Sequence, residues 1–310
     1  MNLNKLHLLI HLNYEIKNSE AIYISKFFSE LNGFVDSDFL KLEGNISEKA
    51  FSALIEINKN KNKYIEELKV IEEKLVKEQI GIINFHDEYY PENLKYISHP
   101  PSLLFYRGNK ECLKNNNMIA IIGTRTPTQE GINLTTNLSA LLSNNGFVIV
   151  SGLAVGIDAT AHKSSINNDG STIAVLPGSI GSSELYPKAN RDLSEEIIEK
   201  NGLLISELSL GAPPSKKNIV ARNRIQAGLS KIIIPTEFKE GSGTIHAINF
   251  GKKDQRLILI PNSKDYKSVP KSFIDNCDFT FDVMLEDILD IINVNINKNI
   301  FKKDKPTNLL

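Results

Sequence analysis

The stretch Met118-Ile-Ala-Ile-Ile-Gly-Thr-Arg-Thr-Pro127 decides the fold, because a short apolar run ends there in a glycine turn. Similar apolar runs recur along the chain at residues 119–122, 147–150, 172–176, 203–205, 232–235 and 257–260, with helix-length segments between them. Near-continuous apolar strands are typical of a parallel sheet covered by helices on both faces. The pattern predicts an α/β fold with a doubly wound, mostly parallel, Rossmann-like sheet.

Segments on either side of this pattern predict two smaller units. Apolar residues before residue 78 recur at helical spacing and predict a small helical N-terminal domain, residues 1–78, with the Asn- and Lys-rich run 58–63 as a loop. Strand-like runs at 80–85 and 103–106 lead into the Rossmann-like domain, residues 79–265. Residues 266–310 predict one helix near 283–292, then a disordered tail, and no winged-helix domain.

Composition restricts the function without identifying it. The 310 residues are 41% hydrophobic, enough for a proper core, and the net charge of −1 gives no global attraction to nucleic acid. Cys112 and Cys277 have no disulfide-framework or zinc spacing, which indicates a reducing cytoplasm. There is no signal-peptide pattern and no apolar run near the roughly 18 residues of a membrane span. We expect a cytoplasmic protein with no membrane partner.

Glycine turns follow three of the predicted strands, where ligands bind in such sheets. Backbone N–H groups at a glycine turn before a helix can hold an anion. The residues of these turns are Gly123, Thr124 and Arg125, then Ser151, Gly152 and Gly156, then Gly241, Ser242, Gly243 and Thr244. Thr126 and Pro127 replace the second glycine of a dinucleotide fingerprint, so no NAD cofactor is expected.

Basic side chains accompany these turns. Lys188 follows the third strand of the sheet, and between residues 211 and 231 there are five cations and no acidic residue: Lys216, Lys217, Arg222, Arg224 and Lys231. This combination favours a groove for several consecutive phosphates. Tyr186 and Phe250 could stack on bases, although aromatic rings of this kind are more often buried in the core.

Asp158 and His162 are four residues apart on one predicted helix, the spacing of a metal pair. No third ligand accompanies them, so a hydrogen bond within the helix is the better interpretation and no metal is expected.

Taken together, the motifs resemble the DNA-processing protein A (DprA/Smf) family. The resemblance rests on the Gly123-Thr124-Arg125 turn, on the Ser151–Asp158 run with His162, on residues 186–190 and on Arg222-Asn223-Arg224. It implies a homodimer that binds single-stranded DNA, protects it during natural transformation and recombination, and helps to load the RecA recombinase, without a catalytic step. It also implies that Arg125 and Lys188 grip phosphates, with Arg224 supporting them and Asn223 in the same site.

Two alternatives remain open. One is a nucleotide-binding or nucleotide-hydrolysing enzyme related to the lysine-decarboxylase-like family, because residues 240–244 partly match its Pro-Gly-Gly-x-Gly-Thr motif. Ala247 then stands where a catalytic glutamate is required, and a methyl group cannot transfer a proton. The other alternative is a nucleotide-sensing module that signals through the N-terminal helices. Binding of oligothymidine compared with mononucleotides distinguishes these hypotheses.

Overall fold

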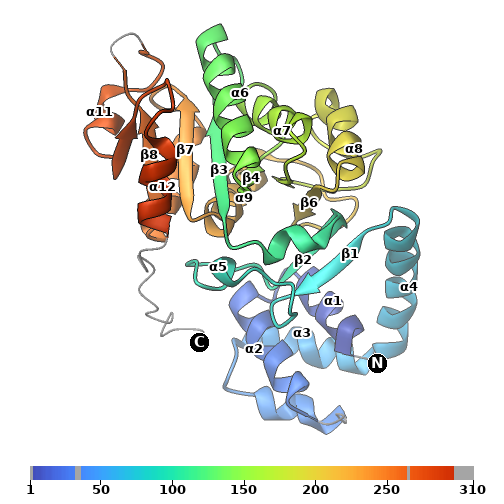
Figure 1. Cartoon of the computed structure of the whole chain (residues 1–310). Coiled ribbons are helices and arrows are strands. Elements are labelled where there is room, and N and C mark those ends of the chain that lie inside the picture. The colour runs from blue at the N-terminus through green and yellow to red at the C-terminus, as the bar shows by residue number, and fades with distance from the viewer. Residues whose placement is uncertain (1–2, 32–35, 264–265, 297–310) are drawn as a thin grey trace.

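A computed structural model describes residues 3–31, 36–263 and 266–296. Within these residues nine strands form one sheet, in the order β1-β2-β6-β5-β4-β3-β7-β8-β9 (Figure 1). The strands are β1 (Gly81–Asn84), β2 (Leu103–Gly108), β3 (Met118–Gly123), β4 (Val148–Ser151), β5 (Thr172–Val175), β6 (Leu203–Ser206), β7 (Ile232–Glu237), β8 (Leu257–Pro261) and β9 (Phe279–Phe281).

Strand direction confirms the predicted fold class. From β6 to β9 all neighbouring strands pair in parallel, whereas β1 pairs antiparallel with β2 and β2 with β6. The chain passes outward through β3, β4, β5 and β6, and then returns to place β7 on the other side of β3. The strand order therefore reverses between β3 and β7, where open α/β sheets bind ligands.

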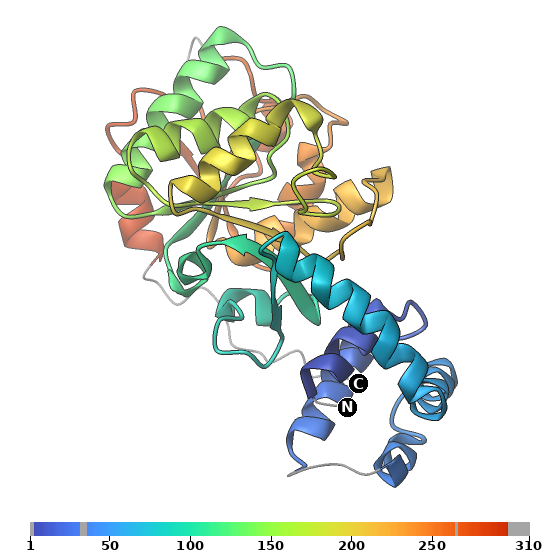
Figure 2. The ribbon, with the colours of Figure 1, turned by 90° about the vertical axis from the view of Figure 1, so that its right-hand side faces the viewer.

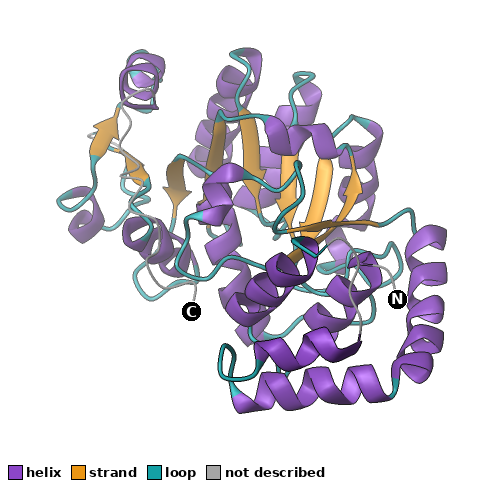
Figure 3. Cartoon of the chain, turned by 90° about the horizontal axis from the view of Figure 1, so that it is seen from below, coloured by secondary structure: helices purple, strands orange, loops and turns teal. Residues whose placement is uncertain are grey.

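Helices cover both faces of the sheet, as the view from below shows (Figure 3). One face carries α6 (Gln129–Asn144), α7 (Ile157–Asn167) and α8 (Arg191–Glu199), and the other carries α9 (Lys216–Leu229) and α10 (Thr244–Lys253) (Figures 1 and 2). On β5, Ile173 and Val175 pack into the core beside α9, while Ala174 packs into the core beside α8. Burial on both faces explains why the strands are apolar along their whole length.

The N-terminal helices project to one side of the sheet (Figure 2). They are α1 (Leu3–Leu12), α2 (Asn18–Ser29), α3 (Glu48–Lys59) and α4 (Lys61–Lys77), with a 3₁₀ helix at Asp36–Leu42. The predicted loop at 58–63 is wrong, because only Asn60 separates α3 from α4. Its N–H donates to the Glu56 carbonyl and its own carbonyl accepts from the Tyr64 N–H, so the helical hydrogen bonds continue through it.

Beyond β8 the chain continues the same sheet. β9 pairs in parallel with β8, and Ile288 and Ile292 of α12 (Ile288–Ile296) are buried in the core that contains β3 and β7. The sequence predicted this helix a few residues early and missed β9, which has only three residues. The predicted disordered tail lies largely at residues 297–310, outside the described part of the chain. The three-domain division stays a prediction.

Short helices connect the larger elements: α5 (Glu92–Lys95), α11 (Lys271–Ile274) and 3₁₀ turns at Lys110–Lys114 and Lys188–Asn190. Among the described residues no helix combines the length and the apolar character that crossing a membrane requires.

Candidate functional site

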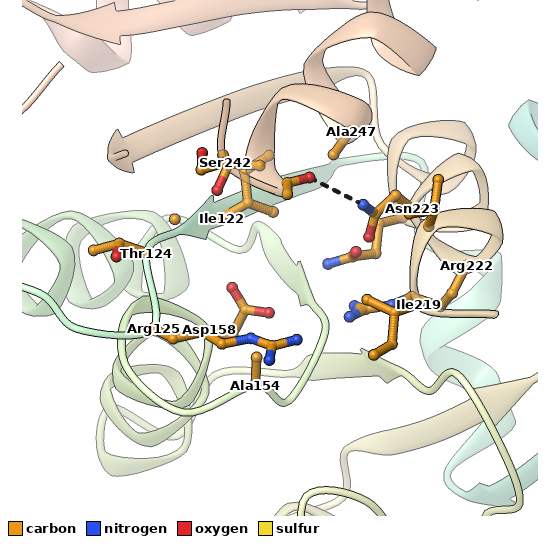
Figure 4. A pocket seen from close by; sticks show the side chains of 15 residues that line it. Ile122, Thr124, Arg125, Ala154, Asp158, Ile219, Arg222, Asn223, Ser242 and Ala247 are labelled. Atoms are coloured by element: carbon orange, nitrogen blue, oxygen red, sulfur yellow. Dashed lines mark hydrogen bonds between the residues drawn. The ribbon is translucent and has the colours of Figure 1, made fainter. Parts of the chain in front are cut away.

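A pocket of about 360 Å³ opens at the strand-order reversal between β3 and β7 (Figure 4). Its walls come from the turn after β3, the start of α7, one face of α9 and the start of α10. The lining residues are Ile122, Gly123, Thr124, Arg125, Ala154, Asp158, Ile219, Val220, Arg222, Asn223, Gln226, Ser242, Gly243, Thr244 and Ala247. The structure thus brings together the first and third predicted glycine turns, whereas the second contributes its neighbours Ala154 and Asp158 and none of Ser151, Gly152 and Gly156.

Arg222 is the central cation of this pocket. Its side chain is buried, with 7% of its surface exposed, and its Nε and Nη1 atoms have no hydrogen-bond partner. Burial lowers the pKa of Arg222 to about 10, against the opposing effect of the nearby Asp158 carboxylate. The guanidinium therefore stays charged at neutral pH with two unpaired nitrogens. Unpaired buried donors are costly in a protein unless a ligand accepts from them.

Gly152 makes room for this guanidinium. A Cβ at Gly152 would lie 1.5 Å from Nη1 and 2.3 Å from Cζ of Arg222. Glycine here leaves space for the Arg222 side chain and does not serve an unusual backbone angle. Arg125 enters from the opposite wall, on the turn after β3, and is exposed (Figure 4).

Two further buried polar groups in the same pocket lack partners. They are Gln226 Nε2 and Ser242 Oγ. Sequence reasoning missed Gln226, although a signal was present, since Ile219, Arg222, Asn223 and Gln226 follow the i, i+3, i+4, i+7 spacing of one helix face. This face of α9 lines the pocket.

The backbone N–H groups of the first glycine turn, after β3, donate to acceptors within the protein. The N–H of Thr124 donates to the Glu237 carbonyl (2.7 Å), and that of Thr126 to the Thr124 hydroxyl (3.2 Å). The N–H and hydroxyl of Thr128 both donate to the buried Glu237 carboxylate, at 3.0 Å for its Oε2. Glu237 therefore neutralises the start of α6, and the amides of Thr124, Thr126 and Thr128 are already paired within the protein. Anion binding by the rest of this turn, at Arg125, stays a prediction.

The polar groups of the second turn, after β4, also form hydrogen bonds within the protein. The Ser151 hydroxyl donates to the Ile121 carbonyl (2.6 Å) and is fully buried, and the Gly152 N–H donates to Asp158 Oδ2 (3.1 Å). Gly156 has a φ of 86°, and a Cβ there would lie 2.5 Å from the Thr124 carbonyl oxygen. Ser151 and Gly156 thus pack the turns together rather than facing a ligand.

The third turn, at residues 241–244, has free space around its glycines. Gly243 precedes α10 without any side-chain cap, and a Cβ at Gly241 or Gly243 would meet no atom within 4 Å. Asn223 Nδ2 donates to the Gly243 carbonyl (3.3 Å), which fixes this turn against α9 (Figure 4). The N–H groups of Ile245 and His246 already donate to the Ser242 and Gly243 carbonyls (3.2 Å each), so an anion at this helix start would rely on the amides before them.

Arg224 does not belong to the pocket. Its Nε donates to the His99 carbonyl (2.8 Å), its Nη1 to the Ala221 carbonyl (3.0 Å), and its Nη2 forms an ion pair with Glu207. Residues two apart on an α-helix point about 200° apart, so Arg222 and Arg224 cannot serve one face. The predicted supporting role of Arg224 at phosphates is therefore wrong.

Lys188 lies near the pocket without lining it. It is exposed and begins the 3₁₀ turn after Pro187. Tyr186 and Pro187 line a smaller hollow of about 40 Å³ that shares Arg125 and Arg222 with the main pocket. Tyr186 is thus placed where a base could stack, whereas Phe250 packs against the core. Lys231 precedes β7 at the amino end of the strands, away from the pocket.

Asp158 and His162 have separate partners. His162 Nδ1 lies 2.7 Å from the Thr172 hydroxyl, and Asp158 accepts from Gly152, so the expected hydrogen bond within the helix is absent. Burial lowers the pKa of His162 to about 3, with a contribution from Arg222. Across residues 3–31, 36–263 and 266–296 no group of acidic, His and Cys side chains could hold a metal ion.

The fold and the pocket define a Rossmann-like protein with a cationic ligand pocket at the switch point of its sheet. The chain belongs to the DNA recombination-mediator protein A family, whose model matches residues 81–279. It is 40% identical over 183 residues to protein Smf of Synechocystis (58% of this chain, 45% of that protein). It is 37% identical over 185 residues to the DNA processing protein DprA of Bacillus subtilis (59% and 61%). The chain thus matches about half the length of these curated relatives.

Two solved structures of the family resemble this one. DNA processing protein A of Streptococcus pneumoniae aligns with a TM-score of 0.71 at 26% identity, covering 94% of this chain and 97% of that chain. DNA processing protein A of Helicobacter pylori, described for its single-stranded DNA binding mode, aligns with a TM-score of 0.60 at 27% identity, covering 70% and 95%.

Proposed function

We propose that this protein binds single-stranded DNA through backbone phosphates at the pocket between β3 and β7. The observation that carries the proposal is Arg222, a buried guanidinium whose Nε and Nη1 have no protein partner and which lines the pocket. A phosphate oxygen accepts charge-assisted hydrogen bonds from such donors. Arg125 on the opposite wall supplies a second cation.

The shape of the site favours a strand over a single small molecule. The main pocket continues into the hollow beside Tyr186 and Pro187, and Arg125 and Arg222 line both. Lys188 follows directly on the chain and is exposed. Cations spaced along a groove, with an aromatic ring beside them, suit successive phosphates and a stacked base. The single-stranded DNA bound by the Helicobacter pylori protein supports the same ligand class.

We further propose that binding involves no catalytic step. Ala247 lines the pocket at the position where the lysine-decarboxylase-like motif requires a glutamate. The resemblance to the family also supports a homodimer and an interaction with RecA in recombination. Light scattering tests the dimer, and the rate at which RecA assembles on single-stranded DNA, with and without this protein, tests the interaction.

Fluorescence anisotropy of labelled oligothymidine, with mononucleotides as competitors, tests DNA binding. Each phosphate contact on a single strand contributes a slope of about −0.7 in log K against log salt. We expect Arg125→Ala and Lys188→Ala each to weaken binding to all sequences alike and to flatten this slope by up to about one unit. Lys163→Ala, an exposed lysine on α7 that does not line the pocket, is the matched control.

If both pocket-side variants bind DNA like the parent, the proposed groove is in the wrong place. If a mononucleotide competes as well as an oligonucleotide of equal phosphate concentration, the protein is a nucleotide-binding module instead.

A further inference from the structure

The face of α9 that lines the pocket continues into the first turn of that helix. Lys216 stands three residues before Ile219 and four before Val220, and both of these line the pocket. Residues at this spacing share a helix face, with Cβ atoms about 5–6 Å apart. α9 begins after the carboxyl end of β6 and ends before the start of β7, so its first turn lies at the edge of the sheet where the pocket opens. Lys216 therefore lies at the mouth of the pocket.

The loop before α9 is held beside the segment that leads to Lys188. The Ser179 N–H, after β5, donates to the Ala212 carbonyl, before α9, at 3.0 Å. Ile219 lines both the main pocket and the small hollow that precedes Lys188 on the chain. The first turn of α9 thus borders the same groove from the other side, and Lys216 adds a cation along it.

The ammonium group of Lys216 has no partner within the described part of the protein. The side chain is exposed, and among residues 3–31, 36–263 and 266–296 it forms neither an ion pair nor a hydrogen bond. An acidic residue of the adjoining loop, Glu184, accepts instead from the Gly211 N–H at 2.8 Å. Lys216 is therefore available to a ligand.

A lysine at this position opposes the stability of its own helix. The first turn of a helix carries partial positive charge, which acidic residues stabilise and cations destabilise. α6, α7 and α8 each have an acidic residue in the first turn, whereas α9 has none and begins with Lys216 and Lys217. Arg125 and Arg222 add further positive charge at the same edge of the sheet. This accumulation is unfavourable in the free protein and becomes favourable when an anion lies across the helix start.

We propose that Lys216 binds a second phosphate of the strand whose first phosphate Arg222 binds, so that the DNA leaves the pocket over the first turn of α9. The inference rests on the proposed function and gives the path of the strand beyond the pocket. Lys216 and Arg222 are six residues apart, about 9 Å along the helix axis, a separation that suits two phosphates better than one. The buried, unpartnered Nε and Nη1 of Arg222 mark the inner end of this path.

The next residue on the chain supplies a matched control. Lys217 lies in the same turn and is equally exposed, but it stands seven residues before Arg224, on the helix face that points away from the pocket. The variants are Lys216→Ala and Lys216→Glu, with Lys217→Ala and Lys217→Glu as controls. Anisotropy titrations with labelled oligothymidine at about 0.15 M salt, where the Debye length is about 8 Å, limit the effect of a distant charge.

We expect Lys216→Ala to weaken oligothymidine binding about fivefold and to flatten the slope of log K against log salt by up to about 0.7, the contribution of one phosphate contact. Lys216→Glu should weaken binding further, by about twentyfold, because it also repels the strand. The corresponding Lys217 variants should change the affinity by no more than about twofold.

Stability should move in the opposite direction. Both glutamate variants place a negative charge in the first turn of α9, so both should raise the urea midpoint of unfolding. Weaker DNA binding in a more stable protein separates a ligand contact from damage to the fold. A lower midpoint in Lys216→Glu would show that the lysine serves the fold and would contradict the inference.

The binding data can also overturn the inference. Parent-like affinity in Lys216→Glu, or equal losses at Lys216 and Lys217, would show that no phosphate is bound at Lys216, while the proposed function stands. A folded parent that does not bind oligothymidine overturns both.

Discussion

Replacing Gly152 by Ala should remove Arg222 from the pocket while leaving the fold intact. The new Cβ would lie 1.5 Å from Nη1 and 2.3 Å from Cζ of Arg222, so the guanidinium must move. No left-handed backbone angle occurs at Gly152, so alanine fits the chain there. Because Nε and Nη1 have no partners to lose, their displacement breaks no hydrogen bond.

The expected effects on binding and on stability therefore differ. A charge-assisted hydrogen bond contributes about 1.5–3 kcal/mol, which corresponds to a 10- to 100-fold loss of affinity for oligothymidine. The free energy of unfolding should change by less than about 1 kcal/mol, because glycine-to-alanine restricts the unfolded chain and a desolvated arginine returns to water. Anisotropy titrations measure the affinity, and urea unfolding measures the stability.

A double-mutant cycle with Arg222→Ala examines the mechanism. If Gly152→Ala acts only by displacing Arg222, the double variant should bind no more weakly than either single variant. A further loss of affinity in the double variant would refute this reasoning, because the methyl group would then obstruct the ligand itself. Parent-like affinity in Gly152→Ala would show that the guanidinium does not contact DNA at this position.

Two further predictions concern stability. Arg224→Ala should lower the free energy of unfolding by about 3 kcal/mol, because the half-buried Glu207 carboxylate then loses its cation. The affinity for oligothymidine should stay near that of the parent; urea unfolding and anisotropy test this. His162 has a folded pKa of about 3 against an ordinary value of 6.5, so the unfolded state binds more protons between these values and stability falls as the pH drops below 6.5. His162→Gln should flatten this dependence in urea midpoints measured at pH 7 and 5. The part due to His7, whose pKa is about 4, and to His11, whose pKa burial also lowers, should remain.

The sheet was predictable because the burial of its strands on both faces leaves a recognisable apolar pattern in the sequence. A strand buried on both faces must be apolar throughout, as residues 119–122 and 232–235 are, and glycine must follow where the chain turns sharply. β9 was missed because it has three residues, of which Thr280 is exposed and Phe279 only partly buried. So short a strand carries too little pattern to recognise.

The site was only partly predictable, since glycine turns indicate where a backbone bends and not which groups its amides bind. Glu237 comes more than a hundred residues after the turn whose amides it accepts, and no local pattern links them. The position of Arg224 outside the pocket could have been predicted from the sequence, because two residues that are two positions apart on a helix, as Arg222 and Arg224 are, do not share a face. Helical spacing would also have identified Gln226.

α9 connects the pocket to the N-terminal helices, because its two arginines serve opposite faces. Arg222 faces the pocket, while Arg224 pairs with Glu207, whose carboxylate also accepts from Asn18 Nδ2 (2.7 Å). The Glu207 carbonyl lies 2.8 Å from His11 Nε2, and the other ring nitrogen of His11 lies 2.8 Å from the Ser102 hydroxyl. Residues of α1, α2 and the loop after β6 thus hold the helix that presents Arg222. This support fixes the backbone of α9, from which the Arg222 side chain extends into the pocket.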